Sequence, residues 1–230
     1  MKLCVLTVPL QAQPAAEAFA YLSSLGVQQV ELGTGGYTNK NHADPDILLA
    51  QPEKLAELKK ALDDNQLSIA ALSCHGNAVH PDKAVAAEAH RVFVRTCELA
   101  EKLGVDTIVT FSGCPGDSET SQRPNWVTCS WPPEYGETLQ YQWDEVLIPY
   151  WKEAVKIAES HGVRHIALEM HPGFCVYNPA SLLRLREAVG PLIGANVDPS
   201  HLIWQGMDQV AVLRELKGAV YHFHATDTYV

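Results

Sequence analysis

Short apolar runs alternate with helix-length segments along the whole chain, and this alternation restricts the fold more than any other feature. The runs are strand candidates because they are short, rich in apolar residues and flanked by turn residues. They cover residues 3–8, 28–32, 68–74, 107–112, 165–170, 193–198 and 220–224. Helices are predicted between them at residues 14–25, 52–65, 82–103, 143–161, 179–189 and 208–216. Strands that alternate with helices form βαβ units, so we predict a parallel sheet with right-handed crossovers.

The chain has the length of one α/β domain whose parallel sheet closes into a barrel. Its 230 residues, 47% of them hydrophobic, can bury a full core, and we expect residues 1–230 to form a single domain. A closed barrel of this kind needs eight strands, whereas the sequence offers seven runs. Either the sheet is open or these residues begin a longer protein, and we favour the second reading. An open sheet would expose edges that favour association into a homo-oligomer.

One segment, residues 114–142, breaks the alternation. It is rich in Pro, Ser, Thr, Gly and Trp, and a loop of that length after a strand usually has a function. We predict that this segment covers the mouth of the barrel as a lid.

Metal-capable side chains end the last three predicted strands. Glu169, Asp198 and His224 each follow an apolar run. In a ring of parallel strands, the carboxyl ends of neighbouring strands converge on one cavity. We therefore expect these three side chains to meet there and to bind one divalent metal ion. Two carboxylates and one imidazole suit Mn²⁺, Mg²⁺ or Co²⁺, and Zn²⁺ is an alternative.

These candidates also have structural explanations. An acidic residue at a strand end often caps the following helix, and Asp198 before Pro199 fits that role. His222 is expected to be a hydrogen-bonded core histidine, one layer below His224. Three metal-capable residues at consecutive strand ends nevertheless favour the metal site.

Four strings of residues carry a resemblance to a known family. They are Val30-Glu31-Leu32-Gly33, Leu168-Glu169-Met170-His171-Pro172, Asn196-Val197-Asp198-Pro199-Ser200-His201 and His222-Phe223-His224-Ala225-Thr226-Asp227. In order and spacing they resemble the xylose isomerase-like TIM barrels, which include sugar phosphate isomerases and epimerases and share their fold with endonuclease IV. The resemblance implies an α/β fold of the TIM (β/α)8 barrel type, with the C-terminal strand missing from this chain.

The resemblance also implies roles for individual residues. In the epimerases of this family a Glu, an Asp, a His and a second Glu hold one divalent ion. The first three correspond to Glu169, Asp198 and His224, and the second Glu belongs to the eighth strand. The metal-binding glutamates double as the acid/base pair, so Glu169 is the catalytic candidate. His201 resembles the substrate-binding histidine, and His171, which shares the strand parity of Glu169, is expected to contact the substrate.

His75 and Glu31 are further candidates for substrate binding at the mouth. His75 follows the third predicted strand and resembles a metal ligand of the endonuclease branch, and the family often has an acidic residue at the position of Glu31. Two positions depart from the ketose 3-epimerases, which have a Glu and an Arg where this chain has Cys175 and Val230. We therefore do not expect a free ketohexose to be held in the epimerase manner.

Composition narrows the range of partners. The net charge of -10 without a basic run argues against a nucleic-acid-binding surface, because phosphate neutralisation needs clustered Lys and Arg. No segment approaches the roughly 20 apolar residues of a membrane span, so no membrane partner is expected. Six cysteines without a CxxC pair favour reduced thiols in a cytoplasmic protein.

Together these features predict a metal-dependent isomerase or epimerase. Its substrate is a small-molecule carbohydrate, either a sugar, a sugar phosphate or a cyclitol, and the proton transfer passes through an enediolate. A dehydratase of the same fold would use the same chemistry. The alternatives are an endonuclease IV-like nuclease with three zinc ions and a sugar-binding barrel without turnover.

Overall fold

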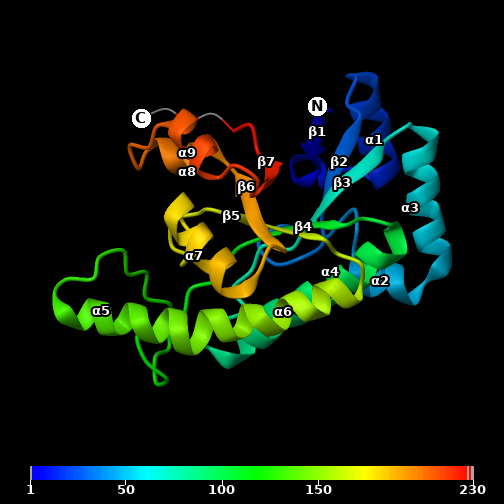
Figure 1. The fold of residues 1–230 in the computed structure, drawn as a ribbon. Coiled ribbons are helices and arrows are strands. Elements are labelled where there is room, and N and C mark those ends of the chain that lie inside the picture. Colours follow the sequence, from blue (N-terminus) through cyan, green and yellow to red (C-terminus); the bar gives the residue numbers. More distant parts are fainter. Residues whose placement is uncertain (1, 227, 229–230) are drawn as a thin grey trace.

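The computed structural model describes residues 2–226 and 228, in which seven parallel strands form one curled sheet (Figure 1). The strands lie in the sheet in their order along the chain, and every neighbouring pair is parallel. They are β1 (Cys4–Leu6), β2 (Gln29–Gly33), β3 (Ser68–Ser73), β4 (Thr107–Thr110), β5 (His165–Glu169), β6 (Ile193–Val197) and β7 (Val220–Phe223). The predicted α/β class is confirmed, as a curled half-barrel that has seven of the eight strands of a closed barrel within the described residues.

Helices connect the strands and cover the outer face of the sheet (Figure 1). The α-helices are α1 (Ala15–Ser24), α2 (Pro45–Ala50), α3 (Pro52–Asp64), α4 (Lys83–Leu103), α5 (Pro133–Gln140), α6 (Ile148–Ser160), α7 (Pro179–Val189), α8 (Pro199–Ile203) and α9 (Gln209–Glu215). A 3₁₀ helix, η1 (Val8–Leu10), follows β1, and a π-helical segment, η2 (Tyr141–Leu147), joins α5 to α6. Every predicted helix is present. The sequence did not reveal α2, α5 and α8, because helices of six, eight and five residues are too short to show a helical period.

The main core lies between the helices and the outer face of the sheet. Phe19 of α1, Leu99 of α4 and Trp151 of α6 are among its largest fully buried side chains.

The long helix α4 begins after Asp82, whose side chain accepts hydrogen bonds from the backbone N–H groups of Ala84 and Val85. Within the described residues, no helix is both long enough and apolar enough to cross a membrane.

Small apolar residues occupy the inside of the sheet. Ala71 of β3, Val109 of β4 and Ala167 of β5 form a separate buried cluster against Tyr221. Alternate residues of a strand face the same side, so Glu169, two positions after Ala167, points into the same interior. This apolar cluster therefore lies directly below the polar side chains on the inner side of the sheet.

Strand register brings polar residues of different strands to one level. Glu169 of β5 is paired with Asn196 of β6, and Asn196 is paired with His222 of β7. Beyond β7, the backbone N–H of His224 donates to the carbonyl oxygen of Val197 at 2.9 Å. The polar positions of the last three strands therefore follow from the backbone ladder.

Strands β1 and β7 are the edges of the sheet in the part of the chain that the structure describes. Each pairs with one neighbour, β1 with β2 and β7 with β6. Side chains nevertheless connect the two ends of the sheet, because Glu31 of β2 contacts both His222 and His224.

The loop after β2 passes close to the end of β3 and requires a glycine. Gly36 has a φ of +70°, and a Cβ atom added to it would lie 2.0 Å from the carbonyl oxygen of His75. The same oxygen accepts a hydrogen bond from the N–H of Tyr37 at 2.7 Å. A side chain at position 36 would therefore displace the backbone that carries His75.

We expect Gly36→Ala to lower the free energy of unfolding by about 1 to 3 kcal/mol more than Gly26→Ala does. Both glycines have a positive φ, +70° and +81°, so both variants carry similar backbone strain, but an added Cβ at Gly26 has no atom within 4 Å. The difference between the variants therefore isolates the contact with His75. Urea unfolding followed by circular dichroism measures both values, and equal losses would contradict this account.

Candidate functional site

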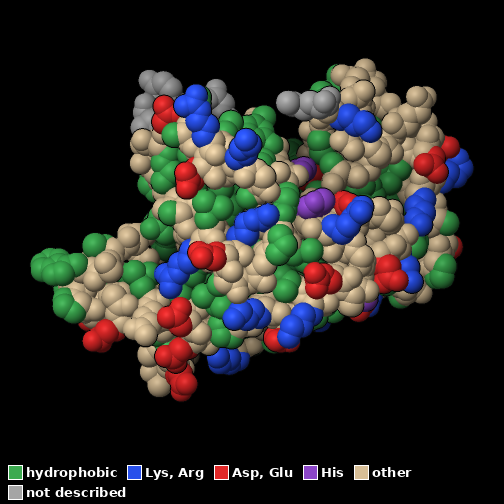
Figure 2. Space-filling view, viewed as in Figure 1, with side chains coloured by type: hydrophobic (Ala, Val, Ile, Leu, Met, Phe, Trp, Pro, Cys, Tyr) green, Lys and Arg blue, Asp and Glu red, His purple; other side chains and the backbone are tan. Residues whose placement is uncertain are grey.

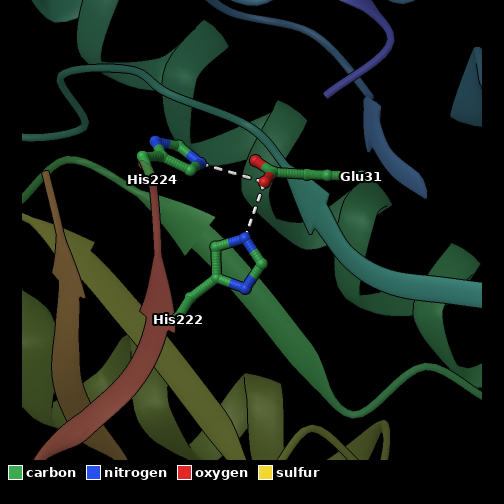
Figure 3. A group of neighbouring side chains, drawn as sticks. All are labelled: Glu31, His222 and His224. Atoms are coloured by element: carbon green, nitrogen blue, oxygen red, sulfur yellow. Dashed lines mark hydrogen bonds and ion pairs between the residues drawn. The ribbon is translucent and has the colours of Figure 1, made fainter. Parts of the chain in front are cut away.

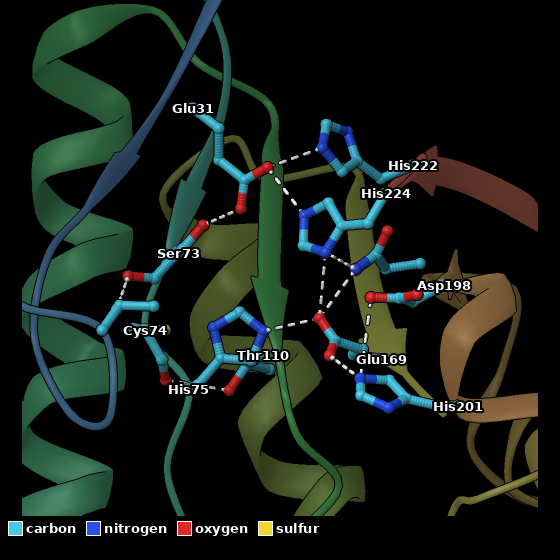
Figure 4. A network of polar contacts seen from close by, with 12 residues as sticks. Glu31, Ser73, Cys74, His75, Thr110, Glu169, Asp198, His201, His222 and His224 are labelled. Carbon is cyan, nitrogen blue, oxygen red and sulfur yellow. Dashed lines mark hydrogen bonds and ion pairs between the residues drawn. The ribbon is translucent and has the colours of Figure 1, made fainter. Parts of the chain in front are cut away.

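Glu169, at the carboxyl end of β5, is the centre of a network of histidines (Figure 4). Nε2 of His75 lies 3.1 Å from its carboxylate, Nε2 of His201 lies 3.0 Å away and Nδ1 of His224 lies 3.1 Å away. His75 follows β3, His201 belongs to α8 and His224 follows β7. The carboxyl ends of the strands thus converge on Glu169, as the strand pattern predicts.

His224 connects Glu169 to a second carboxylate, that of Glu31 on β2. Its Nδ1 faces Glu169, and its Nε2 lies 2.9 Å from Oε2 of Glu31. His222 places its Nε2 2.7 Å from the same Glu31 oxygen (Figure 3). The hydroxyl of Ser73 donates to the other Glu31 oxygen. His222 is therefore a hydrogen-bonded histidine on the inner side of the sheet, as predicted.

The carboxylate of Asp198 is fixed by the start of α8. Its Oδ1 accepts hydrogen bonds from the backbone N–H of Ser200 at 2.9 Å and from the Ser200 hydroxyl at 2.7 Å. Its Oδ2 accepts the Thr226 hydroxyl at 3.0 Å and lies 3.6 Å from Nε2 of His201. The predicted helix-capping role is confirmed, and it leaves the second oxygen directed toward the histidine network.

Three carboxylates are buried at the site without a permanently charged partner. Glu31 is 1% exposed, and Glu169 and Asp198 are 6% exposed. Among the described residues, no lysine or arginine forms an ion pair with any of them, and their ionisable contacts are histidines. Buried anions without fixed cations are unfavourable. The site therefore requires protons on the histidines or a bound cation.

The pKa shifts follow from burial and from these contacts. Burial raises the pKa of Glu169 and of Glu31, but hydrogen bonds from the surrounding histidines outweigh burial and hold both pKa values well below the usual range. Burial lowers the pKa of His224, yet its hydrogen bonds to the two glutamates raise it to about 10. Burial also opposes protonation of His201, whose pKa is nevertheless raised by its carboxylate neighbours.

Two groups of these side chains are arranged so that they could hold a metal ion. Within each group the ligand atoms lie within 4.8 Å of one another, and the groups are Glu169, Asp198 and His201, and Glu31, His222 and His224. The three ligands predicted from the sequence are divided between these groups: Glu169 and Asp198 belong to the first, and His224 belongs to the second. Glu169 contacts His224 directly, and His201 lies between Glu169 and Asp198. Carboxylates with imidazoles form an oxygen-rich ligand set for a divalent cation.

Aromatic side chains border the network on the side of β4. Phe111, which follows β4, stacks on Phe174 with the ring centroids 4.2 Å apart. Its ring also contacts those of His75 at 4.5 Å and His171 at 5.0 Å. Neither phenylalanine could be predicted from the sequence, because an apolar residue after a strand has the same pattern whether it lines a site or a core.

The structure brings all the predicted site residues into one contact network. Polar contacts join six of them, and His171 joins through its ring, which lies 4.2 Å from that of His201. Asn196 was not predicted, although its Nδ2 lies 3.0 Å from both Oε2 of Glu169 and Nδ1 of His224. Its only sequence signal is an amide within an apolar strand. The motif residue Asp227 and the departing position Val230 lie outside the described residues.

Residues 114–142, the predicted lid, pack beside α7 and the loop before it. The ring of Trp126 lies 5.3 Å from that of Tyr177, and the Gln142 side chain donates to the carbonyl oxygen of Asn125 at 2.6 Å. The prediction of a loop throughout is wrong, because α5 occupies the end of the segment and continues through η2 into α6. Closure of this segment over the mouth stays a prediction.

The network opens to solvent on one side. Figure 2 shows a hollow between the part of the molecule that carries β7 and α9 and the part that carries β1 and α1, with a histidine side chain at its bottom. The side chains of His201 and His224 are 23% and 16% exposed, whereas that of His75 is 6% exposed. A ligand that enters from solvent therefore reaches His201 and His224 more readily than His75.

Comparison with known proteins matches the chain to one family over most of its length. A family model described as xylose isomerase-like TIM barrel matches residues 19–230. The uncharacterized protein YfiH of Bacillus subtilis (strain 168) is 41% identical over 233 residues, which cover 100% of this chain and 74% of that protein.

Solved structures with a similar fold are more distant in sequence. The 3-keto-D-glucoside 4-epimerase YcjR from E. coli superposes with a TM-score of 0.70 at 15% identity, covering 99% of this chain and 79% of that one. A xylose isomerase-like TIM barrel protein from Mycobacterium smegmatis, in complex with magnesium, gives a TM-score of 0.66 at 14% identity, covering 97% and 74%. At these identities the likeness shows the fold alone.

The metal-free protein is expected to lose stability as the pH rises above neutrality. The pKa of His224 is raised from 6.5 to about 10, so its protonation stabilises the fold fully below the lower value, and this stabilisation is lost as the pH rises through the upper one. Glu31 and Glu169 have lowered pKa values, so their contribution is present above their usual pKa and is lost only in acid.

Urea unfolding in the presence of EDTA, repeated from about pH 6 to about pH 10, measures this loss. The His224→Asn variant should show a smaller decline over the same range, because the shifted imidazole is absent. A decline in the variant that parallels that of the wild type would contradict the assignment of the effect to His224.

Proposed function

The chain belongs to the xylose isomerase-like TIM barrel family, and from this premise we propose that it is a divalent-metal-dependent isomerase or epimerase. The proposed substrate is a sugar, a sugar phosphate or a cyclitol with a hydroxyl group next to a carbonyl. One observation carries the proposal: a buried Glu169 lies among three histidines where the strands end, with Asp198 beside them and with no lysine or arginine paired to either in the described chain.

We propose that Glu169, Asp198 and His224 hold the ion, and that His201, whose Nε2 lies beside Glu169 and Asp198, contacts the substrate. These residues fit a divalent cation because Oε2 of Glu169 and Nδ1 of His224 lie 3.1 Å apart, and two such lone-pair atoms need a proton or a cation between them. When bound, such an ion would supply positive charge that polarises a carbonyl group and stabilises negative charge developing on its oxygen. The magnesium in the structure of the Mycobacterium smegmatis protein supports a divalent cation as the bound ion.

Glu169 is the proposed acid/base. In an isomerisation, Glu169 takes the proton from the carbon atom next to the carbonyl group and returns it to the former carbonyl carbon. In an epimerisation it is one of two acid/base groups, because the proton must return to the same carbon from the opposite face. Its lowered pKa keeps the carboxylate ionised at neutral pH, and the same histidine contacts limit its basicity. The transfer is therefore fast only if the charge on the substrate oxygen is stabilised at the same time. His201, whose pKa is raised, is placed to donate a hydrogen bond to that oxygen.

An aromatic wall is the proposed surface for the apolar face of the substrate. Phe111 and Phe174 stack next to the histidine network, and His75 and His171 touch the same wall. Aromatic rings pack against the C–H face of a sugar ring and exclude water from the carbon that loses its proton. We propose His75 and His171 as substrate contacts there.

Three further proposals concern the whole molecule. We propose that residues 1–230 form one domain, because strands from both ends of the chain contribute to the same network. The six cysteines are free in the described chain, which agrees with the proposed cytoplasmic location. A small carbohydrate remains the proposed partner, and association of copies through the sheet edges stays a prediction.

One observation favours a second candidate function, a metal-dependent nuclease. His75 lies 3.1 Å from Glu169, and it resembles a metal ligand of the endonuclease IV branch. Where that branch has a histidine after the fourth strand, this chain has Thr110 and Ser112, and its net charge of -10 opposes phosphate binding. We therefore rank the nuclease second.

Metal analysis is expected to give a single divalent ion per chain. Purified protein is stripped with EDTA, dialysed against equal amounts of Mn²⁺, Mg²⁺, Co²⁺ and Zn²⁺, and measured by plasma mass spectrometry. The Asp198→Asn variant should retain less metal, because it loses a charged ligand. Three zinc ions per chain would favour the nuclease, and no bound metal under any condition would contradict the proposed centre.

Glu169→Gln is expected to reduce proton transfer by about 10²- to 10⁴-fold while the protein stays folded. Deuterium uptake from D₂O at the carbon next to a carbonyl group, measured by NMR on a panel of ketoses, ketose phosphates and keto-cyclitols, detects this step for any stereocentre. Glu101→Gln is the matched control, because Glu101 also pairs with a histidine, His161 at 2.7 Å, but is exposed. Unchanged uptake in Glu169→Gln would rule out its acid/base role.

A further inference from the structure

We infer that Glu31 is a positioning residue that selects the nitrogen atom through which His224 binds the ion. The inference rests on the proposed function, since it concerns the same metal centre. From the sequence, Glu31 is predicted to contact the substrate. In the structure, however, its carboxylate is already occupied by groups of the protein.

Glu31 reaches from β2 to the inner side of β7 (Figure 3). Its Oε2 lies 2.7 Å from Nε2 of His222 and 2.9 Å from Nε2 of His224, and its Oε1 accepts the hydroxyl of Ser73. The residue is 1% exposed. Two imidazole donors and one hydroxyl donor therefore surround a carboxylate that is closed to solvent, which leaves little room for a substrate hydroxyl.

The occupied carboxylate determines the tautomer of His224. An ionised carboxylate only accepts hydrogen bonds, so the Nε2 atom that faces Glu31 must carry its proton. The lone pair of a neutral His224 is then on Nδ1, which faces Oε2 of Glu169 at 3.1 Å and Nδ2 of Asn196 at 3.0 Å (Figure 4). Glu31 thereby directs the coordinating nitrogen toward the proposed ion and away from the sheet edge.

The backbone places His224, through its N–H bond to Val197 at 2.9 Å, but it does not determine which ring nitrogen faces Glu169. His224 follows β7, which in the described part of the chain pairs with β6 only. The contact with Glu31 ties the imidazole ring to β2, near the other end of the sheet. A carboxylate that holds the second nitrogen of a metal-bound histidine fixes its ring and raises its basicity, and its loss typically weakens metal binding about 10- to 100-fold.

A second ion at Glu31, His222 and His224 is the competing explanation, because their ligand atoms lie within 4.8 Å of one another. Such an ion would have to displace the Nε2 protons of both histidines. His224 would then face an ion with each of its two nitrogens. Positioning requires neither change, so we favour it.

Calorimetric titration of the EDTA-stripped protein with Mn²⁺ tests the inference. For Glu31→Gln, which keeps the shape of the side chain but loses its charge, we expect unchanged stoichiometry and an affinity about 10- to 100-fold lower. His222→Gln is the matched control: it alters the other Glu31 contact and should bind Mn²⁺ nearly as tightly as the wild type. Urea unfolding of the metal-free variants shows that they are folded.

The outcomes separate the positioning role from the metal centre itself. Equal affinity in Glu31→Gln and wild type would overturn the positioning role and leave the centre standing. Two ions in the wild type, reduced to a single ion in both variants, would make Glu31 a ligand and also overturn it. No binding by the wild type would overturn the proposed centre, and the inference with it.

Nitrogen-15 NMR of the Zn²⁺-loaded wild type shows which ring nitrogen of His224 carries a proton and which binds the ion. A change in stability alone would not alter this assignment. We expect His224 to show a protonated Nε2 and a metal-bound Nδ1. Coordination through Nε2 would overturn the assignment.

Discussion

Compensation of buried negative charge is the constraint on which the site depends. Glu31, Glu169 and Asp198 are almost fully enclosed, yet their charged neighbours in the described chain are histidines alone. A lysine or arginine would neutralise these carboxylates permanently, and the site would then no longer attract a cation. Histidines supply positive charge that a cation can replace, since the ion takes the place of a proton. The same arrangement therefore balances the buried negative charge with protons and allows a cation to take their place.

The sheet supplies the geometry that this charge balance needs. Parallel pairing sets Glu169, Asn196 and His222 side by side on consecutive strands, above a floor of alanine and valine side chains. Helix α8 begins directly after β6, so the residue that caps it, Asp198, is held at the same edge. None of these placements requires a long or flexible loop. The polar network is consequently as rigid as the backbone ladder beneath it.

The sequence predicted the strands and the residues at their carboxyl ends because both depend on local patterns. An apolar run and a metal-capable residue after it are visible without knowledge of the fold, as for Glu169 and Asp198. The contact of Glu31 with His222 and His224 was not predictable, because it depends on how far the sheet curls. Asn196 was not predicted as a site residue, because a single amide within an apolar strand has no periodic signal. The helix α5 was missed because Pro, Gly and Trp residues made its surroundings look like a loop.

The bond between Glu31 and His222 joins residues 191 positions apart, and this separation has a consequence for folding. Contacts of such long range form late, because the closure of a large loop must precede them. During synthesis the amino-terminal strands emerge first, and the Glu31 carboxylate can meet Ser73 of β3 but neither of its histidines until β7 has been made. The nascent chain therefore carries an exposed acidic group at the centre of its future interior, and premature collapse around it is disfavoured. Closure of the interior around Glu31 is therefore expected to follow the arrival of the last strand, which supplies the histidines that compensate its charge.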